Sequence, residues 1–163
     1  MTSDAAPVIY TIGHGGGSFT DLERRLGPHR VGIIVDVRSQ PWSSRAPDFN
    51  RDALEIHAAG VGLAYRWLGR SLGGRPSERT PSAADGDLAE EQAMAASPSF
   101  SAGLDEVEGL ADIAPVVLLC AETDARSCHR ATLIAPALIA RGYHVHHIDA
   151  HGVAEPHQDR LPG

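Results

Sequence analysis

The stretch from residue 116 to residue 130, VVLLCAETDARSCHR, places four chemically capable side chains directly after a run of apolar residues. They belong to Glu122, Cys128, His129 and Arg130. A buried strand that ends in a polar loop and leads into a helix presents such groups at the carboxyl edge of an α/β sheet. The stretch therefore predicts a functional site at that edge, although it does not define the reaction.

Cys128 is a candidate nucleophile because it is expected at a helix N-terminus beside His129 and Arg130. Such surroundings lower the pKa of a thiol. A thiol that packs without reacting is the alternative, and Cys120, at the end of a buried strand, is expected to be structural. In a reducing compartment both cysteines are expected as thiols, with a redox pair between them as a further alternative.

Asp36 and Glu122 are expected at the ends of two strands, where they could act as nucleophile and general acid or base on a glycosidic or N-glycosidic bond. His14, after the first strand, is a candidate proton carrier. The alternative is structural: the two carboxylates pair with Arg38 and Arg130, and His14 orients its turn.

The sequence also predicts an anion site. Backbone N–H groups of the GHGGGS turn and of the helix near Cys128 would face the carboxyl edge, and arginines could add charged hydrogen bonds. In the alternative the glycines only form a tight turn. The candidate ligand-binding residues are Gly13, Gly15, Ser18, Arg38, Ser39, Arg45, His129 and Arg130.

Metal ligands are present in type but not in a recognised zinc spacing. In the last predicted strand His144 and His146 share one face, whereas His147 and Asp149 share the other. No metal and no cofactor is therefore predicted. The GHGGGS turn imitates a dinucleotide fingerprint, but Ser18 occupies its third glycine position, so a nicotinamide dehydrogenase is not expected.

Hydrophobic periodicity gives the elements that must position these groups. Strands are predicted at residues 8–12, 31–37, 61–69, 116–120 and 143–149, and helices at 19–26, 49–59, 87–96, 100–110 and 129–141. Ser18 should cap the first of these helices, Gly27 and Pro28 should end it, and Pro136 should kink the last. Alternating strands and helices predict a three-layer α/β/α, Rossmann-like domain with a mainly parallel sheet.

Length predicts a single domain over residues 1–163, with a core at about 8–150, a flexible insertion at about 70–99 and a loose tail at about 151–163. The net charge of -7 argues against a general nucleic-acid coat. All 14 basic residues are arginine, which excludes lysine chemistry. Neither a signal peptide nor a membrane-length apolar run is seen, so the expected location is the cytoplasm.

Four segments in order, TIGHGGGSF at 11–19, DVRSQPWSSRAPDF at 36–49, YRWLGRSLGG at 65–74 and CAETDARSCHR at 120–130, resemble the domain of unknown function 488 family. The resemblance covers residues 8–148. The family typically has a serine after TIGH, where this chain has Gly15. The resemblance implies an α/β fold and a site built from these motifs, and it implies no reaction.

These observations favour a cytoplasmic hydrolase or transferase that binds a small phosphorylated or nucleotide-like ligand at the carboxyl edge. The alternative is a non-catalytic module that binds a nucleotide or a nucleic-acid end. A thiol-based or metal-binding enzyme is a further alternative. No membrane partner is expected, and the sequence does not define the oligomeric state.

Overall fold

The computed structural model describes residues 7–73, 96–123, 128 and 130–158. Its centre is one six-stranded sheet with strands β1 (Val8–Gly13), β2 (Ile33–Asp36), β3 (Ala64–Trp67), β4 (Val116–Cys120), β5 (His144–Ile148) and β6 (Ala154–Pro156). The order across the sheet is β3-β2-β4-β1-β5-β6. The first five strands are parallel, and β6 runs antiparallel to β5.

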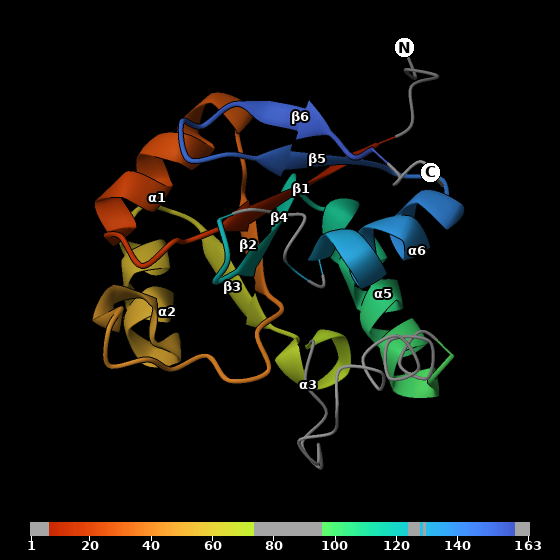
Figure 1. Cartoon of the computed structure of the whole chain (residues 1–163), viewed down its shortest axis with the longest axis horizontal. Helices are drawn as coiled ribbons and strands as arrows, with labels where there is room; N and C mark the ends of the chain where they lie inside the picture. The colour runs from red at the N-terminus through yellow and green to blue at the C-terminus, as the bar shows by residue number, and fades with distance from the viewer. Residues whose placement is uncertain (1–6, 74–95, 124–127, 129, 159–163) are drawn as a thin grey trace, which may run out of the picture.

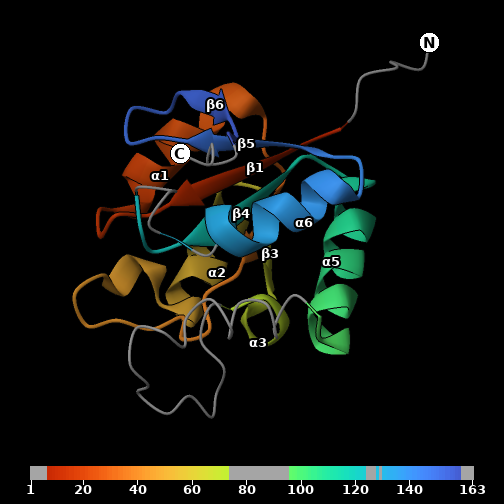
Figure 2. The same ribbon diagram turned by 45° about the vertical axis from the view of Figure 1, so that its right-hand side comes forward.

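Helices cover both faces of this sheet, which confirms the predicted three-layer α/β/α, Rossmann-like fold (Figure 1). One face carries α1 (Phe19–Leu26) and α2 (Arg51–Gly60) with the short 3-10 turns η1 (Gly27–His29) and η2 (Pro47–Phe49). The other face carries α3 (Gly69–Leu72), α5 (Pro98–Ala111), the π-helical turn η4 (Arg130–Ile134) and α6 (Ala135–Ala140). The rotated view brings α6 in front of β1 and β4, with α1 on the left and α5 on the right (Figure 2).

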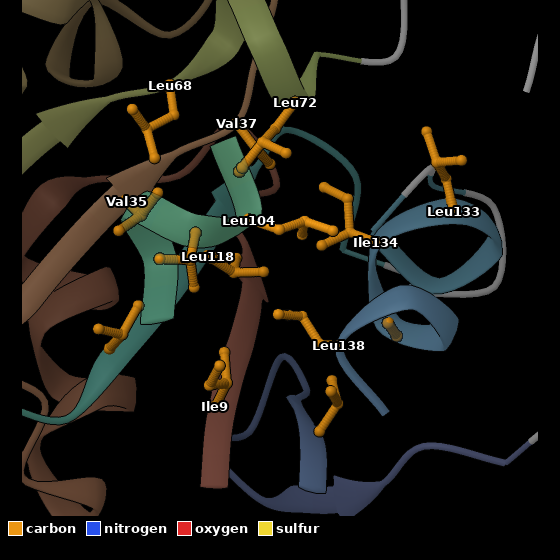
Figure 3. Packing of buried hydrophobic residues seen from close by; sticks show 14 of the residues in the cluster. Ile9, Val35, Val37, Leu68, Leu72, Leu104, Leu118, Leu133, Ile134 and Leu138 are labelled. Atoms are coloured by element: carbon orange, nitrogen blue, oxygen red, sulfur yellow. The ribbon is translucent and has the colours of Figure 1, made fainter. Parts of the chain in front are cut away.

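The core is divided by the sheet into two apolar layers. Leu104 of α5 and Leu138 of α6 meet Ile9, Val35 and Leu118 of the strands in one layer (Figure 3). In the other layer α1 and α2 pack on alternate residues of the same strands, including Ile12, Ile34, Val117 and Leu119. All five residues of β4 are buried, as expected for a strand covered on both faces.

The start and end of α1 follow the predicted signals. Ser18 caps the helix by accepting a hydrogen bond from the backbone N–H of Asp21 at 3.2 Å. The helix ends at Leu26, directly before Gly27 and Pro28, which enter η1. The predicted cap and stop are therefore both confirmed.

The last predicted helix differs from expectation in the position of its irregularity. Residues 130–134 form a π-helical turn, and the α-helix proper begins at Ala135. Pro136 is the second residue of α6 and has no backbone N–H to donate to the π-helical turn before it. The irregularity expected around Pro136 therefore occurs in the turn that precedes the proline.

Two further segments bear on the predicted organisation. The expected loose tail contains β6, which pairs with β5 through Ile148 and Ala154. Most of the expected insertion at 70–99, including nearly all of its predicted helix at 87–96, lies outside the described residues. No helix within the described ranges is long and apolar enough to cross a membrane.

Candidate functional site

The loops after β1 and β4 leave the sheet toward opposite helical layers, although these two strands are neighbours. β1 leads into α1 on one face, and β4 leads into η4 and α6 on the other. Ligands of open α/β sheets bind at the carboxyl ends of strands where connections diverge in this way. His14 and Glu122 follow these two strands directly, so both stand at the favoured place.

Strand alternation divides the candidate residues between the two faces of the sheet. Asp36, with Arg38 and His14, lies on the side of α1 and α2, where Tyr65 and Phe49 contact them. Cys120 and Cys128 belong to the opposite layer. The predicted residues therefore form two groups, and a single wall that combines all of them is not found.

The carboxylate of Asp36 is fully buried and bound from several directions. Its Oδ1 accepts hydrogen bonds from Nε of Arg38 at 2.8 Å and from the Arg38 backbone N–H at 3.1 Å. Its Oδ2 accepts from Nη2 of Arg38 at 2.7 Å and from the Tyr65 hydroxyl at 2.5 Å. Burial and this carboxylate raise the pKa of Tyr65, which keeps the phenol protonated. The geometry favours a positioning role for Asp36 over a nucleophilic one.

Arg38 is held in a fixed orientation by these contacts. Besides the two bonds to Asp36, its Nη2 donates to the backbone carbonyl of Phe49 at 2.6 Å. No described residue accepts a hydrogen bond from its Nη1. One end of a buried, rigid guanidinium is therefore available to a ligand at the end of β2.

His14 lies beside this group and is uncharged. Its ring stacks on Phe49 with centroids 4.4 Å apart, and the residue is buried. Burial lowers its pKa from 6.5 to about 4, and the nearby Arg38 guanidinium adds to the effect. Nδ1 accepts a hydrogen bond from the Gly16 backbone N–H at 2.9 Å, so the ring proton sits on Nε2. Neutral His14 therefore acts as a hydrogen-bond donor through Nε2.

The glycine-rich turn uses most of its own backbone donors, contrary to the expectation of an open anion cradle. The N–H groups of His14 and Gly15 donate to the carbonyls of Cys120 and Ala121 at 2.9 and 3.0 Å. The N–H of Phe19, at the start of α1, donates to a carboxylate oxygen of Asp48 at 3.0 Å. Asp48 thus occupies the place an anion would take at this helix N-terminus.

Gly13 and Gly15 instead serve close packing against the loop after β4. A Cβ on Gly13 would lie 1.7 Å from the backbone oxygen of Glu122. Gly15 has φ of +68°, and a Cβ there would lie 2.4 Å from Oγ1 of Thr123. Glycine at position 15 thus fits a left-handed turn against Thr123 that a serine would enter only with strain.

Arg130 is buried in the second group, where it binds the same loop from the other side. Its Nη2 donates to the backbone carbonyls of Glu122 and Thr123 at 2.7 and 2.9 Å, and its Nη1 donates to the Thr11 hydroxyl at 2.7 Å. Thr11 also bonds Nδ1 of His147 at 2.5 Å. Burial, with the charge of Arg130, lowers the pKa of His147 to about 4. Arg130 therefore holds the loop that carries Glu122.

The two cysteines are joined to each other in this structure, which corresponds to the redox pair that the sequence offered as the alternative to two thiols. Cys120 and Cys128 form a disulfide across a sequence separation of 8, and both are buried. The bond ties the end of β4 to the start of the following helical segment. Cys128 has no thiolate in this form, and nucleophilic chemistry at that residue would first require reduction.

One known protein family matches this chain. A family model described as "Domain of unknown function DUF488" matches residues 19–136. The chain belongs to the DUF488 family. No curated protein and no solved structure matches it. The DUF488 match includes Asp36, Arg38 and the segment from Glu122 to Arg130, whereas the TIGH turn precedes its first residue.

The remaining candidates of this DUF488 chain are mostly at the surface. Glu122 is exposed, and no described residue pairs with its carboxylate. Arg45 is also exposed, Ser39 is half-buried beside Gly73, and Ser18 caps α1. His129 lies outside the described residues. Glu122 thus remains the one predicted catalytic carboxylate, within the described part of the chain, that is open to a ligand.

Sequence reasoning missed the residues that hold the DUF488 motifs in place. Arg25 of α1 is buried and donates to the carbonyls of Gly13 and His14 at 3.0 and 3.3 Å. Phe49 and Tyr65 fix His14 and Asp36. Of these residues, only Arg25 could have been noticed in the sequence, because it stands among the apolar residues on the buried face of an amphipathic helix.

No group of three histidine, cysteine or acidic side chains suited to a metal ion occurs among the described residues. The terminal histidines follow the predicted alternation. His146 approaches Tyr10 on the α1 side, at 6.2 Å between ring centroids, whereas His147 faces Thr11 and Arg130. The histidine run is thus divided by the sheet.

Proposed function

We propose that this DUF488 chain is a hydrolase or transferase that binds a phosphate-bearing, nucleotide-like small molecule at the carboxyl edge of the sheet. The observation that carries the proposal is Arg38, buried and fixed by Asp36, with Nη1 unused by the described residues. A planar guanidinium held in this way can donate to a phosphate oxygen without first losing side-chain freedom.

His14 supplies a second donor on the same side of the sheet. Its neutral ring is held against Phe49, whose carbonyl also binds Arg38. Two fixed donors converging on one anion stabilise charge that develops on a phosphoryl or carbonyl oxygen in a transition state. His14 in this tautomer is therefore assigned to charge stabilisation through Nε2.

Glu122 is the group assigned to the reaction itself. It follows β4 directly, its backbone is clamped by Arg130 and Gly13, and its carboxylate is exposed. An ionised carboxylate at this position can act as a general base for water or as a nucleophile. Asp36 is assigned to positioning Arg38.

The test measures binding of inorganic phosphate and of adenosine monophosphate by calorimetry. Arg38→Lys keeps the charge but cannot bind both Asp36 oxygens, so we expect affinity to fall by about tenfold or more. Arg141→Gln is the control, because Arg141 pairs with Asp105 and Glu108 before the start of β5, at the opposite edge. Equal losses in the two variants, or no binding by the unmodified protein, would reject the proposal.

A non-catalytic binding module is the second candidate, and a specific observation favours it. Asp36 is saturated with hydrogen bonds and Cys128 is in a disulfide, so two of the four candidate catalytic groups are engaged. Turnover of a panel of phosphate esters and nucleotides by the protein and by Glu122→Gln separates the two functions. Binding without turnover supports the module, whereas turnover lost in Glu122→Gln supports the enzyme.

A cytoplasmic location completes the proposal. Cytosolic thiol pools keep most cysteines reduced, so in that compartment the Cys120–Cys128 bond would exchange between its oxidised and reduced forms. A thiol-based reaction at Cys128 would require the reduced form. Counting free thiols in protein isolated under alkylating conditions gives the oxidation state directly.

A further inference from the structure

Two arginines gather around one tryptophan beside Arg38. The guanidinium carbon of Arg51, at the start of α2, lies 4.6 Å from the ring centroid of Trp67, and that of Arg70, in α3, lies 6.0 Å from it. Trp67 ends β3, and both arginines are exposed. Cation–π contacts of this kind are weakly attractive at exposed positions and favour these orientations of the two long side chains.

Neither arginine has an acidic partner among the described residues. Arg66, on the same strand as Trp67, pairs with Glu106 at 3.2 Å, so the neighbourhood does not lack carboxylates in general. Two like charges beside one ring repel each other, and an anion between them would remove that cost. This excess of positive charge stands out in a chain whose net charge is -7.

The tryptophan is tied to the segment that carries Arg38. Its Nε1 donates to the backbone carbonyl of Arg38 at 2.8 Å. Gly69 lets the two segments approach, because a Cβ there would lie 1.9 Å from that same carbonyl oxygen. The Arg51–Trp67–Arg70 cluster therefore adjoins the backbone of Arg38 through direct contacts, at the carboxyl ends of the neighbouring strands β2 and β3.

We propose that Arg51 and Arg70 form a second anion subsite, so that the ligand of this chain carries at least two phosphate groups. The inference rests on the proposed function, in which Arg38 receives the first phosphate. Asp36 offsets the charge of Arg38, so Arg38 supplies geometry while Arg51 and Arg70 supply net positive charge. A nucleoside diphosphate or another diphosphate ester has the required chemistry.

Calorimetry with inorganic phosphate and inorganic pyrophosphate tests the second subsite on the full chain. We expect pyrophosphate to bind about tenfold more tightly or better, and the double variant Arg51→Gln, Arg70→Gln to lose that advantage while phosphate affinity stays within about twofold. Both positions are exposed, so folding should be retained. Arg66→Gln is the matched control, because it removes one charge from the same strand.

An equal loss of pyrophosphate affinity in Arg66→Gln and in the double variant would overturn the second subsite, as would equal affinities for the two anions. Failure of the proposed function gives a different result. In that case Arg38→Lys leaves the affinity for inorganic phosphate unchanged, independently of the affinity for pyrophosphate. Fluorescence gives an independent readout, because Trp42→Phe leaves Trp67 as the sole tryptophan. Its emission should change saturably with pyrophosphate, and an unchanged emission would count against the cluster.

Discussion

Asp36 binds Arg38 with both carboxylate oxygens, at 2.8 Å to Nε and 2.7 Å to Nη2. Only Val37 separates the two residues. Asp36 ends β2, and its carboxylate fixes the guanidinium of Arg38 at the carboxyl edge of the sheet. Tyr65 and the carbonyl of Phe49 complete the hydrogen bonding. This pair is the structural basis of the proposed anion site.

Breaking the buried pair should be costly for stability. Asp36→Asn leaves the Arg38 charge buried without its counter-ion, and we expect the free energy of unfolding to fall by about 3 to 5 kcal/mol. Urea denaturation of the variant and of the unmodified protein measures this change in the free energy of unfolding. Glu106→Gln, which breaks the exposed pair with Arg66, should cost no more than about 1 kcal/mol. Similar costs for the two variants would show that the Asp36–Arg38 pair is not a structural anchor.

Close packing of the turn against the β4 loop makes a second prediction. Gly13→Ala would place a methyl group 1.7 Å from the Glu122 carbonyl oxygen, so the loop must move and stability should fall by about 2 kcal/mol or more. Gly109→Ala is the control, because Gly109 lies in α5 with nothing near its Cβ position, and it should stabilise by about 0.5 to 1 kcal/mol. Thermal unfolding of both variants measures these changes in stability. A Gly13→Ala variant as stable as the unmodified protein would contradict the close packing of Gly13 against the Glu122 carbonyl.

The lowered pKa of His14 predicts a pH dependence of stability. Between about pH 6.5 and pH 4 the unfolded chain binds a proton at this position and the folded chain does not, so the free energy of unfolding falls as pH falls through that window. The full effect is about 3 kcal/mol, and it levels off below pH 4. His14→Gln should reduce the slope of this part of the profile without removing it, because the pKa of His147 is also lowered to about 4. Replacement of the exposed His151 should leave the slope unchanged. An imidazole NMR titration with a midpoint near 6.5 for His14 would contradict the assignment.

The disulfide predicts a dependence on reductant. Opening the Cys120–Cys128 bond releases a short loop in the unfolded chain, which should lower the free energy of unfolding by about 2 to 3 kcal/mol. Denaturation with and without a dithiol reductant measures the change. The double variant Cys120→Ala, Cys128→Ala is the control, since its stability should not respond to reductant. An unmodified protein that is equally stable under both conditions would show that the bond contributes nothing.

The sequence predicted where most helices and strands lie along the chain, but it did not predict the order of the strands in the sheet. Local periodicity and the Ser18 cap placed the strands and α1, because these depend on short-range patterns. The insertion of β4 between β1 and β2 depends on long-range packing, and no local pattern encodes it. The arrangement of Arg38 with Asp36 was foreseen only as an alternative.

The division of the candidate site by the sheet was also not foreseen. Strand alternation sends Asp36 to one face and Cys120 to the other, and Arg130 turns toward Thr11 and the loop carbonyls. The contribution of Arg25 was missed because a buried arginine is not expected on a helix face that otherwise packs against the core. Such partners are found only when distant segments are brought together.

The central claim, that Arg38 and His14 bind a phosphate group, is tested most directly by NMR titration of the protein with inorganic phosphate. Resonances of the Arg38 guanidinium and of the His14 Nε2 proton should shift together and saturate with one common affinity, while those of Arg141 stay unchanged. Shifts spread evenly over exposed arginines, with Arg38 and His14 unmoved, would contradict the account.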